Sequence, residues 1–238
     1  MIRRSYEGPL RGALGDVQRD IVACRKCPRL VEHRERKALQ ERRKSFATWD
    51  YWGAPVPSYG DPGARLLIVG LAPGSHGANR TGRMFTGDPT ADFLVQALYR
   101  AGFSNQPTSQ HRNDGLKLVD AYEVAVARCA PPNDKPTTTE LSNCSAFLAA
   151  ELGLLTKVRA ILALGRVGFE HFLRALSTTT GVRLRADFKH GAVYSLGGGL
   201  PTLFCSYHPS PRNTNTGRLT EALLDDVLSK VRSFIDDE

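Results

Sequence analysis

The sequence predicts an α/β protein, with a three-layer α/β/α arrangement around a central parallel sheet. Four apolar, β-rich runs alternate with helical patterns, and the alternation is regular from the first run to the last. The runs are residues 65–71, 122–129, 160–165 and 202–208. Strands that alternate with helices form right-handed βαβ crossovers, which make the strands parallel and cover both faces of the sheet.

The helical segments are identified by charge or by apolar spacing. Residues 29–44 are densely charged and favour helix, so we expect a solvated helix there. The aromatic loop at residues 46–63 comes next, and it either packs at the edge of the domain or forms a wall of a binding cleft. Helical patterns follow the first three runs, at residues 91–102, 139–155 and 166–177. Residues 220–237 form a closing amphipathic helix.

Length and composition are those of one globular domain. The chain has 238 residues, of which 41% are hydrophobic and 24% charged, and no apolar run approaches the roughly 20 residues that cross a bilayer. We therefore expect a single domain over residues 1–238 with a flexible N-terminal segment at residues 1–15. The N-terminus has no apolar signal-peptide core, which favours a cytoplasmic location. The formal net charge of +8 favours polyanionic partners, of which nucleic acid is the commonest.

The topology predicts where a ligand binds. In parallel sheets ligands bind at the carboxyl ends of the strands, so the loops after Gly70, Arg128, Gly165 and Tyr207 are expected to face one cleft. The first of these loops, residues 70–88, is rich in glycine but lacks the endings of a P-loop and of a dinucleotide-binding loop. Nucleotide phosphate is therefore disfavoured as its ligand.

Three side chains in these loops are candidates for chemistry. Phe85 offers an aromatic face or is simply part of the core, and Asp88 holds water or simply caps the following helix. His208 follows the last strand and is fixed by two prolines, which aims it into the predicted cleft. Because both loops are expected at the same end of the sheet, a functional role is favoured.

The cysteines indicate a metal site. Cys24 and Cys27 form a C-x-x-C pair, and Cys129 and Cys144 are two further candidates. Four thiolates suit zinc or an iron–sulfur cluster, and spacing does not decide between these or exclude unliganded thiols. Cys205 lies within an apolar strand and is expected in the core.

Three motifs together identify a family. The stretches GLAPGSHGANRTGRMFTGD, RCAPPNDKPT and HPSPRNTNTGRL, with the four cysteines, resemble the family 5 (type b) uracil-DNA glycosylases. The resemblance spans Cys24 to Leu219 and implies the uracil-DNA glycosylase-like α/β/α fold. It also implies a [4Fe–4S] cluster on Cys24, Cys27, Cys129 and Cys144, and the excision of uracil and other deaminated bases, such as hypoxanthine and xanthine, in base excision repair.

The resemblance also assigns roles to residues. A glycosylase flips the nucleotide out of the duplex and stabilises the charge that develops on the leaving base. The implied catalytic residues are Asp88, which handles water and the cationic sugar, His208, which donates to the base O2, and Asn133, which lies near the base edge or the water. The residues expected to bind the base are Gly70, Leu71, Ala72, Gly74, His76 and Phe85.

This chain departs from the sister families at three positions. Leu71 replaces a polar residue, so Asp88 is the best water-activating group and base discrimination should be weak. Asp134 stands before the lysine of the proline-rich loop where family members tend to have asparagine, and Asn133 precedes it. Arg212 stands where the uracil-specific enzymes have leucine, and its guanidinium plane can fill the gap left by flipping. The residues expected to contact DNA are Arg80, Arg83, Arg212, Asn213 and Arg218.

The expected partner is double-stranded DNA that contains deaminated bases, with single-stranded DNA as a second form. We expect a monomer without a membrane partner, associated with the nucleoid through DNA. Two other functions are open. One is a protein that traps uracil-DNA on the same scaffold without turnover, although the basic insertion and histidine of that group are missing here. The other is a zinc-dependent nucleic-acid module without catalysis.

Overall fold

A computed structural model describes residues 1–8 and 10–237 of the chain. Pro9 and Glu238, which belong to the single domain predicted over residues 1–238, lie outside the described residues. Pro9 also falls in the segment predicted to be flexible. Among the described residues, no helix is both long enough and apolar enough to span a membrane.

Within the described residues, six strands form one sheet in the order β1-β3-β2-β4-β6-β5. The strands are β1 Tyr59–Gly60, β2 Leu66–Gly70, β3 Ala121–Ala125, β4 Ala160–Leu164, β5 Val193–Tyr194 and β6 Thr202–Ser206. The four inner strands are parallel, and the short edge strands β1 and β5 are antiparallel to their neighbours. The chain runs from β2 outward to β3 and then returns to β4 on the other side of β2. The strand order therefore reverses at β2 and β4, where open α/β sheets bind ligands.

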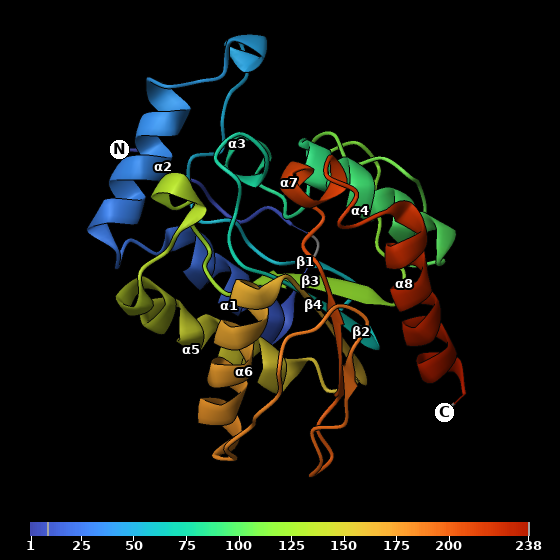
Figure 1. Cartoon of the computed structure of the whole chain (residues 1–238). Helices are drawn as coiled ribbons and strands as arrows, with labels where there is room; N and C mark the ends of the chain where they lie inside the picture. Colours follow the sequence, from blue (N-terminus) through green and yellow to red (C-terminus); the bar gives the residue numbers. More distant parts are fainter. Residues whose placement is uncertain (9, 238) are drawn as a thin grey trace.

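Helices cover both faces of the sheet, which confirms the predicted α/β/α fold (Figure 1). The helices are α1 Gly12–Ala23, α2 Pro28–Leu39, α3 Ala78–Thr81, α4 Pro89–Arg100, α5 Thr138–Leu154, α6 Arg166–Thr180, α7 Pro211–Thr214 and α8 Glu221–Asp236. One face packs against α4 and α8, and the other against α1, α5 and α6. Short 3₁₀ turns occur at Lys44–Phe46 and Pro132–Asp134.

The inner strands are apolar throughout because both of their faces are buried. In β2, Leu66 and Ile68 join the core on the α4 and α8 side, whereas Leu67 and Val69 join the core under α1, α5 and α6. Side chains alternate between the faces of a strand, so a strand covered on both sides needs an apolar residue at every position.

The structure corrects the extent of one predicted strand. The run at residues 122–129 was expected to be a strand to its end, but β3 ends at Ala125. The following residues leave the sheet, with Val126 N–H donating to the Gly70 carbonyl at 3.0 Å and Ala127 N–H to the Leu71 carbonyl at 2.8 Å. The chain after β3 is thus held beside the loop after β2.

The N-terminal part of the chain contains structure that the sequence did not predict. Helix α1 begins at Gly12, inside the segment expected to be flexible. Before it, the Arg4 guanidinium donates to the Asp50 carboxylate and to the Tyr51 carbonyl, each at 2.8 Å. The helix predicted over residues 29–44 ends at Leu39.

Candidate active site and cysteine pocket

The glycine at the end of β2 makes room for an aromatic ring. A Cβ on Gly70 would lie 2.8 Å from Cζ of Phe85, so the Phe85 ring lies directly against the backbone at the carboxyl end of β2. Phe85 is only 8% exposed and has a φ of 40°, and Ser109 Oγ donates to its carbonyl at 2.9 Å. The ring is therefore held at the position where the topology predicts a ligand.

Asp88 lies in the same loop and serves two structural purposes. One carboxylate oxygen accepts a hydrogen bond from Ala91 N–H at 3.0 Å and caps α4. The other, Oδ2, would lie 1.8 Å from a Cβ on Gly77 and 3.3 Å from one on Gly74. The absence of side chains at these glycines is what lets the carboxylate sit inside the loop. Burial there raises the pKa of Asp88, which suits a group that accepts a proton.

His208 is positioned by the ends of β4 and β6. Gly165 follows β4 with a φ of 84°, and a Cβ on it would lie 3.0 Å from Cβ of His208. The Asn213 side-chain amide donates to the His208 carbonyl at 2.8 Å and fixes its backbone. Burial lowers the pKa of His208, while the negative charge of Asp134 opposes this shift. The imidazole is therefore neutral at neutral pH and carries one N–H donor.

The proline-rich loop after β3 carries Asp134, whose negative charge raises the pKa of His208 against the larger effect of burial. Asn133 and Asp134 are both exposed and both have left-handed backbone, with φ of 54° and 55°. Two consecutive residues in this conformation turn the loop sharply. Asp134 is thus electrostatically coupled to His208, whereas the role predicted for Asn133 stays a prediction.

The remaining residues predicted to bind the base lie in the turn after β2, which other segments hold in place. Leu71 and Ala72 are half-buried. Asn79 N–H donates to the Gly74 carbonyl at 3.0 Å, and His76 Nδ1 lies 3.1 Å from the Tyr51 hydroxyl. The turn is therefore ordered by contacts with α3 and with the aromatic loop.

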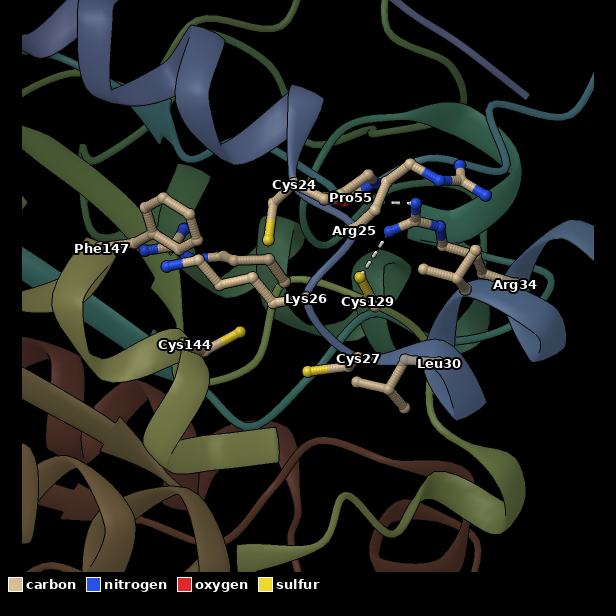
Figure 2. A pocket seen from close by; sticks show the side chains of 12 residues that line it. Cys24, Arg25, Lys26, Cys27, Leu30, Arg34, Pro55, Cys129, Cys144 and Phe147 are labelled. Carbon is tan, nitrogen blue, oxygen red and sulfur yellow. Dashed lines mark hydrogen bonds between the residues drawn. The ribbon is translucent and has the colours of Figure 1, made fainter. Parts of the chain in front are cut away.

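The four cysteines predicted to bind a metal line one pocket (Figure 2). Cys24 and Cys27 flank the junction between α1 and α2, Cys129 follows β3, and Cys144 lies on α5. Burial raises the pKa of the Cys129 thiol to about 12. Cys205 lies apart from them in β6 and is fully buried, as predicted.

Two side chains donate hydrogen bonds to these thiols. Arg34 Nη1 lies 2.8 Å from Cys129 Sγ, and the Asn143 amide lies 3.4 Å from Cys27 Sγ. Arg34 is 1% exposed, although it belongs to a helix that the sequence predicts to be solvated. A helix with this many charges gives no signal of which arginine is buried.

Comparison with known proteins identifies the family. The model of the uracil DNA glycosylase superfamily matches residues 57–232. The chain belongs to this superfamily. It is 49% identical over 224 residues to the type-5 uracil-DNA glycosylase of Mycobacterium leprae, covering 94% of this chain and 96% of the relative. The corresponding proteins of Thermus thermophilus and Pyrobaculum aerophilum are 48% identical over 213 residues and 45% over 220. These matches cover 89% and 92% of this chain, and 94% and 92% of the relatives.

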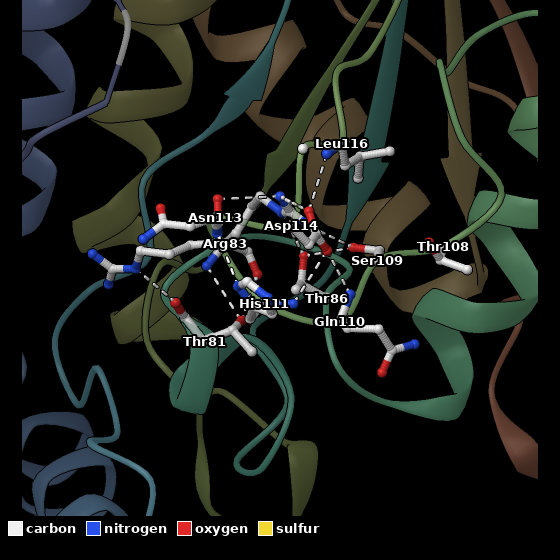
Figure 3. Close-up of polar contacts among 12 residues, drawn as sticks. Thr81, Arg83, Thr86, Thr108, Ser109, Gln110, His111, Asn113, Asp114 and Leu116 are labelled. Carbon is white, nitrogen blue, oxygen red and sulfur yellow. Dashed lines mark hydrogen bonds and ion pairs between the residues drawn. The ribbon is translucent and has the colours of Figure 1, made fainter.

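Arg83 does not lie where the sequence analysis predicted it. It was expected at the DNA surface, but it is buried and its guanidinium donates to both carboxylate oxygens of Asp114, each at 2.8 Å (Figure 3). Burial would raise the pKa of Asp114, but the hydrogen bonds from Arg83, Leu116 N–H and Gln110 N–H lower it to about 2. Arg83 thus holds the segment after α3 against residues 109–116.

Arg80 is also buried rather than exposed to phosphate. Its guanidinium donates to the carbonyls of His76 at 2.7 Å and Gly87 at 2.6 Å, so it bridges the two ends of the glycine-rich loop. The Phe46 and Trp49 rings lie over it, with centroids 3.8 and 4.1 Å from Cζ. The sequence alone does not show whether an arginine is buried and links two segments by hydrogen bonds or lies at the surface as a free cation.

The other two predicted cations remain at the surface near β6. Arg212 is exposed on α7, and Arg218 is exposed with its guanidinium 4.5 Å from the centroid of the Tyr207 ring. Both follow His208 in the chain, and their exposure leaves them open to a polyanion.

Proposed function

We propose that the chain is a monofunctional DNA glycosylase that hydrolyses the N-glycosidic bond of uracil in DNA. The observation that carries this proposal is the Asp88 carboxylate, seated against Gly77 inside the loop after β2. Membership of the uracil DNA glycosylase superfamily, and the type-5 relatives that match most of the chain, support it. The site would initiate base excision repair.

The reaction requires a water molecule, a carboxylate and a donor. Water attacks C1′ of the deoxyribose while the bond between C1′ and the base nitrogen breaks, and the bonding electron pair leaves with the base. Asp88 orients this water, accepts its proton and offsets the positive charge of the sugar. Its raised pKa makes the carboxylate a better proton acceptor than an exposed aspartate.

The leaving base carries negative charge that must be stabilised. The neutral His208 imidazole donates its N–H to the base carbonyl O2, where this charge develops. Phe85 stacks on the flipped base, because its ring is held at the end of β2. Backbone N–H groups of residues 70–76 supply the remaining donors.

We infer a substrate range that extends beyond uracil to hypoxanthine and xanthine. Leu71 gives the position after Gly70 no polar group with which to read a pyrimidine edge. Stacking and backbone donors accept several bases, because they do not depend on one base-specific side chain.

We infer that the cysteine pocket holds a [4Fe–4S] cluster. The donor set fits, since four cysteine thiols from three segments of the chain line one pocket. Four thiolates also suit zinc, and the resemblance to the family 5 enzymes, which implies a cluster on these four residues, is what favours the cluster.

When bound, such a cluster would supply a structural crosslink. Cys24 and Cys27 would tie the junction of α1 and α2 to Cys129 after β3 and to Cys144 on α5. The hydrogen bond from Arg34 would offset the negative charge of the Cys129 sulfur.

The DNA partner is a duplex, and Arg212 on α7 is suited to fill the gap that base flipping leaves. We expect the protein to act as a monomer, with single-stranded DNA as a second substrate.

Duplexes that contain a single uracil, hypoxanthine or xanthine test the activity. After incubation and alkaline treatment, strand cleavage at each lesion is expected, with release of free base. No cleavage at uracil would overturn the proposal, and cleavage at uracil alone would overturn the wider substrate range. A covalent protein–DNA adduct on a denaturing gel would show trapping rather than turnover.

A further inference from the structure

A short segment between α2 and the aromatic loop projects from the molecule beside the candidate site. Residues 42–49, here called the basic arm, form the light-blue turn at the top of Figure 1. Helices α3 and α7, which follow the carboxyl ends of β2 and β6, lie at the same end of the molecule. The arm therefore rises from the side of the sheet where the catalytic loops are.

Within the described part of the chain, no acidic side chain forms an ion pair with Arg43 or Lys44 of the basic arm. Arg43 and Lys44 are both exposed. The acidic residue before the arm, Glu41, pairs with Arg36 at 3.0 Å and with Lys37 at 2.7 Å. The acidic residue after it, Asp50, pairs with Arg4 at 2.8 Å. Both neighbouring carboxylates thus form their ion pairs with residues outside the arm.

Internal hydrogen bonds fix the shape of the arm. Arg42 lies at its base, where Nε donates to the Ala38 carbonyl at 2.6 Å and Nη1 to the Ala47 carbonyl at 3.2 Å. The N–H of Arg43 donates to the Tyr51 hydroxyl at 3.3 Å. A surface held in this way loses little conformational entropy when it binds a partner.

The arm is joined directly to the loop that holds Asp88. The Phe46 and Trp49 rings stack on the Arg80 guanidinium, and that same guanidinium bonds the carbonyl of Gly87, the residue before Asp88. Both rings remain partly exposed. The arm is therefore linked through one side chain, Arg80, to the residue that precedes Asp88.

We propose that the basic arm is a second DNA-contact surface, in which Arg43 and Lys44 bind backbone phosphates of the DNA and Trp49 lies against the bound strand. It would act on the side of the site formed by α3, while Arg212 and Arg218 act from the side of α7. The proposal rests on the proposed function, because it assumes that the lesion strand enters this end of the sheet. The arm would also supply phosphate contacts that the sequence had assigned to Arg80 and Arg83, because both of these side chains are buried and bonded inside the protein.

The salt dependence of DNA binding tests this surface. An undamaged duplex is titrated with wild-type protein and with the double variant R43A/K44A at several salt concentrations. Each lost phosphate contact lowers the slope of log affinity against log salt by about 0.9, so the double variant should lose about 2 from the slope. The slope measures phosphate contacts and does not depend on catalysis.

A matched control removes two positive charges from the opposite end of the sheet, where the strands begin. Lys117 and Lys157 are exposed and precede β3 and β4, at the amino ends of these strands. The variant K117A/K157A should keep the wild-type slope. Equal slopes for the two double variants would overturn the proposal. Absence of uracil excision with the slopes as expected would count against the proposed function alone.

Trp49 provides an independent readout. The chain has two tryptophans, and Trp52 is buried with its indole N–H donating to the Pro55 carbonyl at 2.9 Å. Duplex DNA should quench the fluorescence of the wild-type protein and leave W49F almost unchanged, because phenylalanine keeps a ring over Arg80 and removes the exposed indole. Equal quenching of both proteins, or no quenching of either, would show that DNA does not reach the arm.

Discussion

Replacing Gly77 with alanine tests whether the glycine-rich loop exists to seat the Asp88 carboxylate. The new Cβ would lie 1.8 Å from Asp88 Oδ2, and an ordinary contact needs about 3.4 Å, so the carboxylate must move by about 1.6 Å. Misplacement of a catalytic group by about 1 Å lowers rates by roughly 10²-fold. We therefore expect G77A to lower the single-turnover rate of uracil excision by about 10²-fold or more.

Gly74 provides the matched control. A Cβ there would lie 3.3 Å from the same oxygen, which requires a shift of only about 0.1 Å, so G74A should keep a near-normal rate. The assay is single-turnover excision from a uracil duplex, with urea unfolding of each variant to exclude loss of fold. The double variant G77A/D88N should be no slower than D88N, because both changes act on one group. A wild-type rate for G77A, or equal losses in G77A and G74A, would refute the reasoning.

Three further predictions concern other parts of the molecule. R83M removes the ion pair of the half-buried Asp114 carboxylate, which still accepts hydrogen bonds from backbone N–H groups, so urea should show a loss of about 1–3 kcal/mol in unfolding free energy. This loss should shrink as pH falls toward about 2, the folded pKa of Asp114, because a depressed pKa stabilises only above it. A cluster should give a brown protein with about four irons per chain. C24S should lower the soluble yield and abolish the colour and the iron, while C205S should keep the colour and the iron. R212A should weaken binding to lesion duplexes more than to lesion single strands in a titration, because only a duplex leaves a gap to fill.

The pKa of Asp88 adds a prediction on stability. Its pKa is raised in the folded protein by burial, so its contribution is favourable below the unfolded value and is lost as pH rises through the folded pKa. Urea unfolding should therefore show that D88N gains stability relative to wild type as pH rises above the usual aspartate value of about 3.9. A constant difference across that range would show that Asp88 is not desolvated.

Sequence patterns were sufficient for the inner sheet because its strands have both faces buried. The runs at residues 160–165 and 202–208 match β4 and β6 closely, since a doubly covered strand must be apolar along its length. The strand predicted at residues 122–129 was too long, because β3 ends at Ala125. The residues after Ala125 are mostly apolar and are buried as well, although they do not belong to the sheet. Hydrophobicity reports burial, and it does not distinguish a strand from a buried connection.

The sequence by itself determined the fold class, the loops that meet at one end of the sheet and the candidacy of Asp88 and His208, because the parallel direction of the strands follows from the alternation of apolar runs with helices. The order of the strands in the sheet came from the structure. Only the tertiary structure decided what each charged side chain contacts. Arg80 and Arg83 lie in the same motif as Asp88, yet they are internal braces, while Arg43 and Lys44 project to solvent. The physical reason is that an arginine reaches partners by side-chain packing and hydrogen bonds with distant segments, and those partners are set by the folded arrangement rather than by neighbours in the chain.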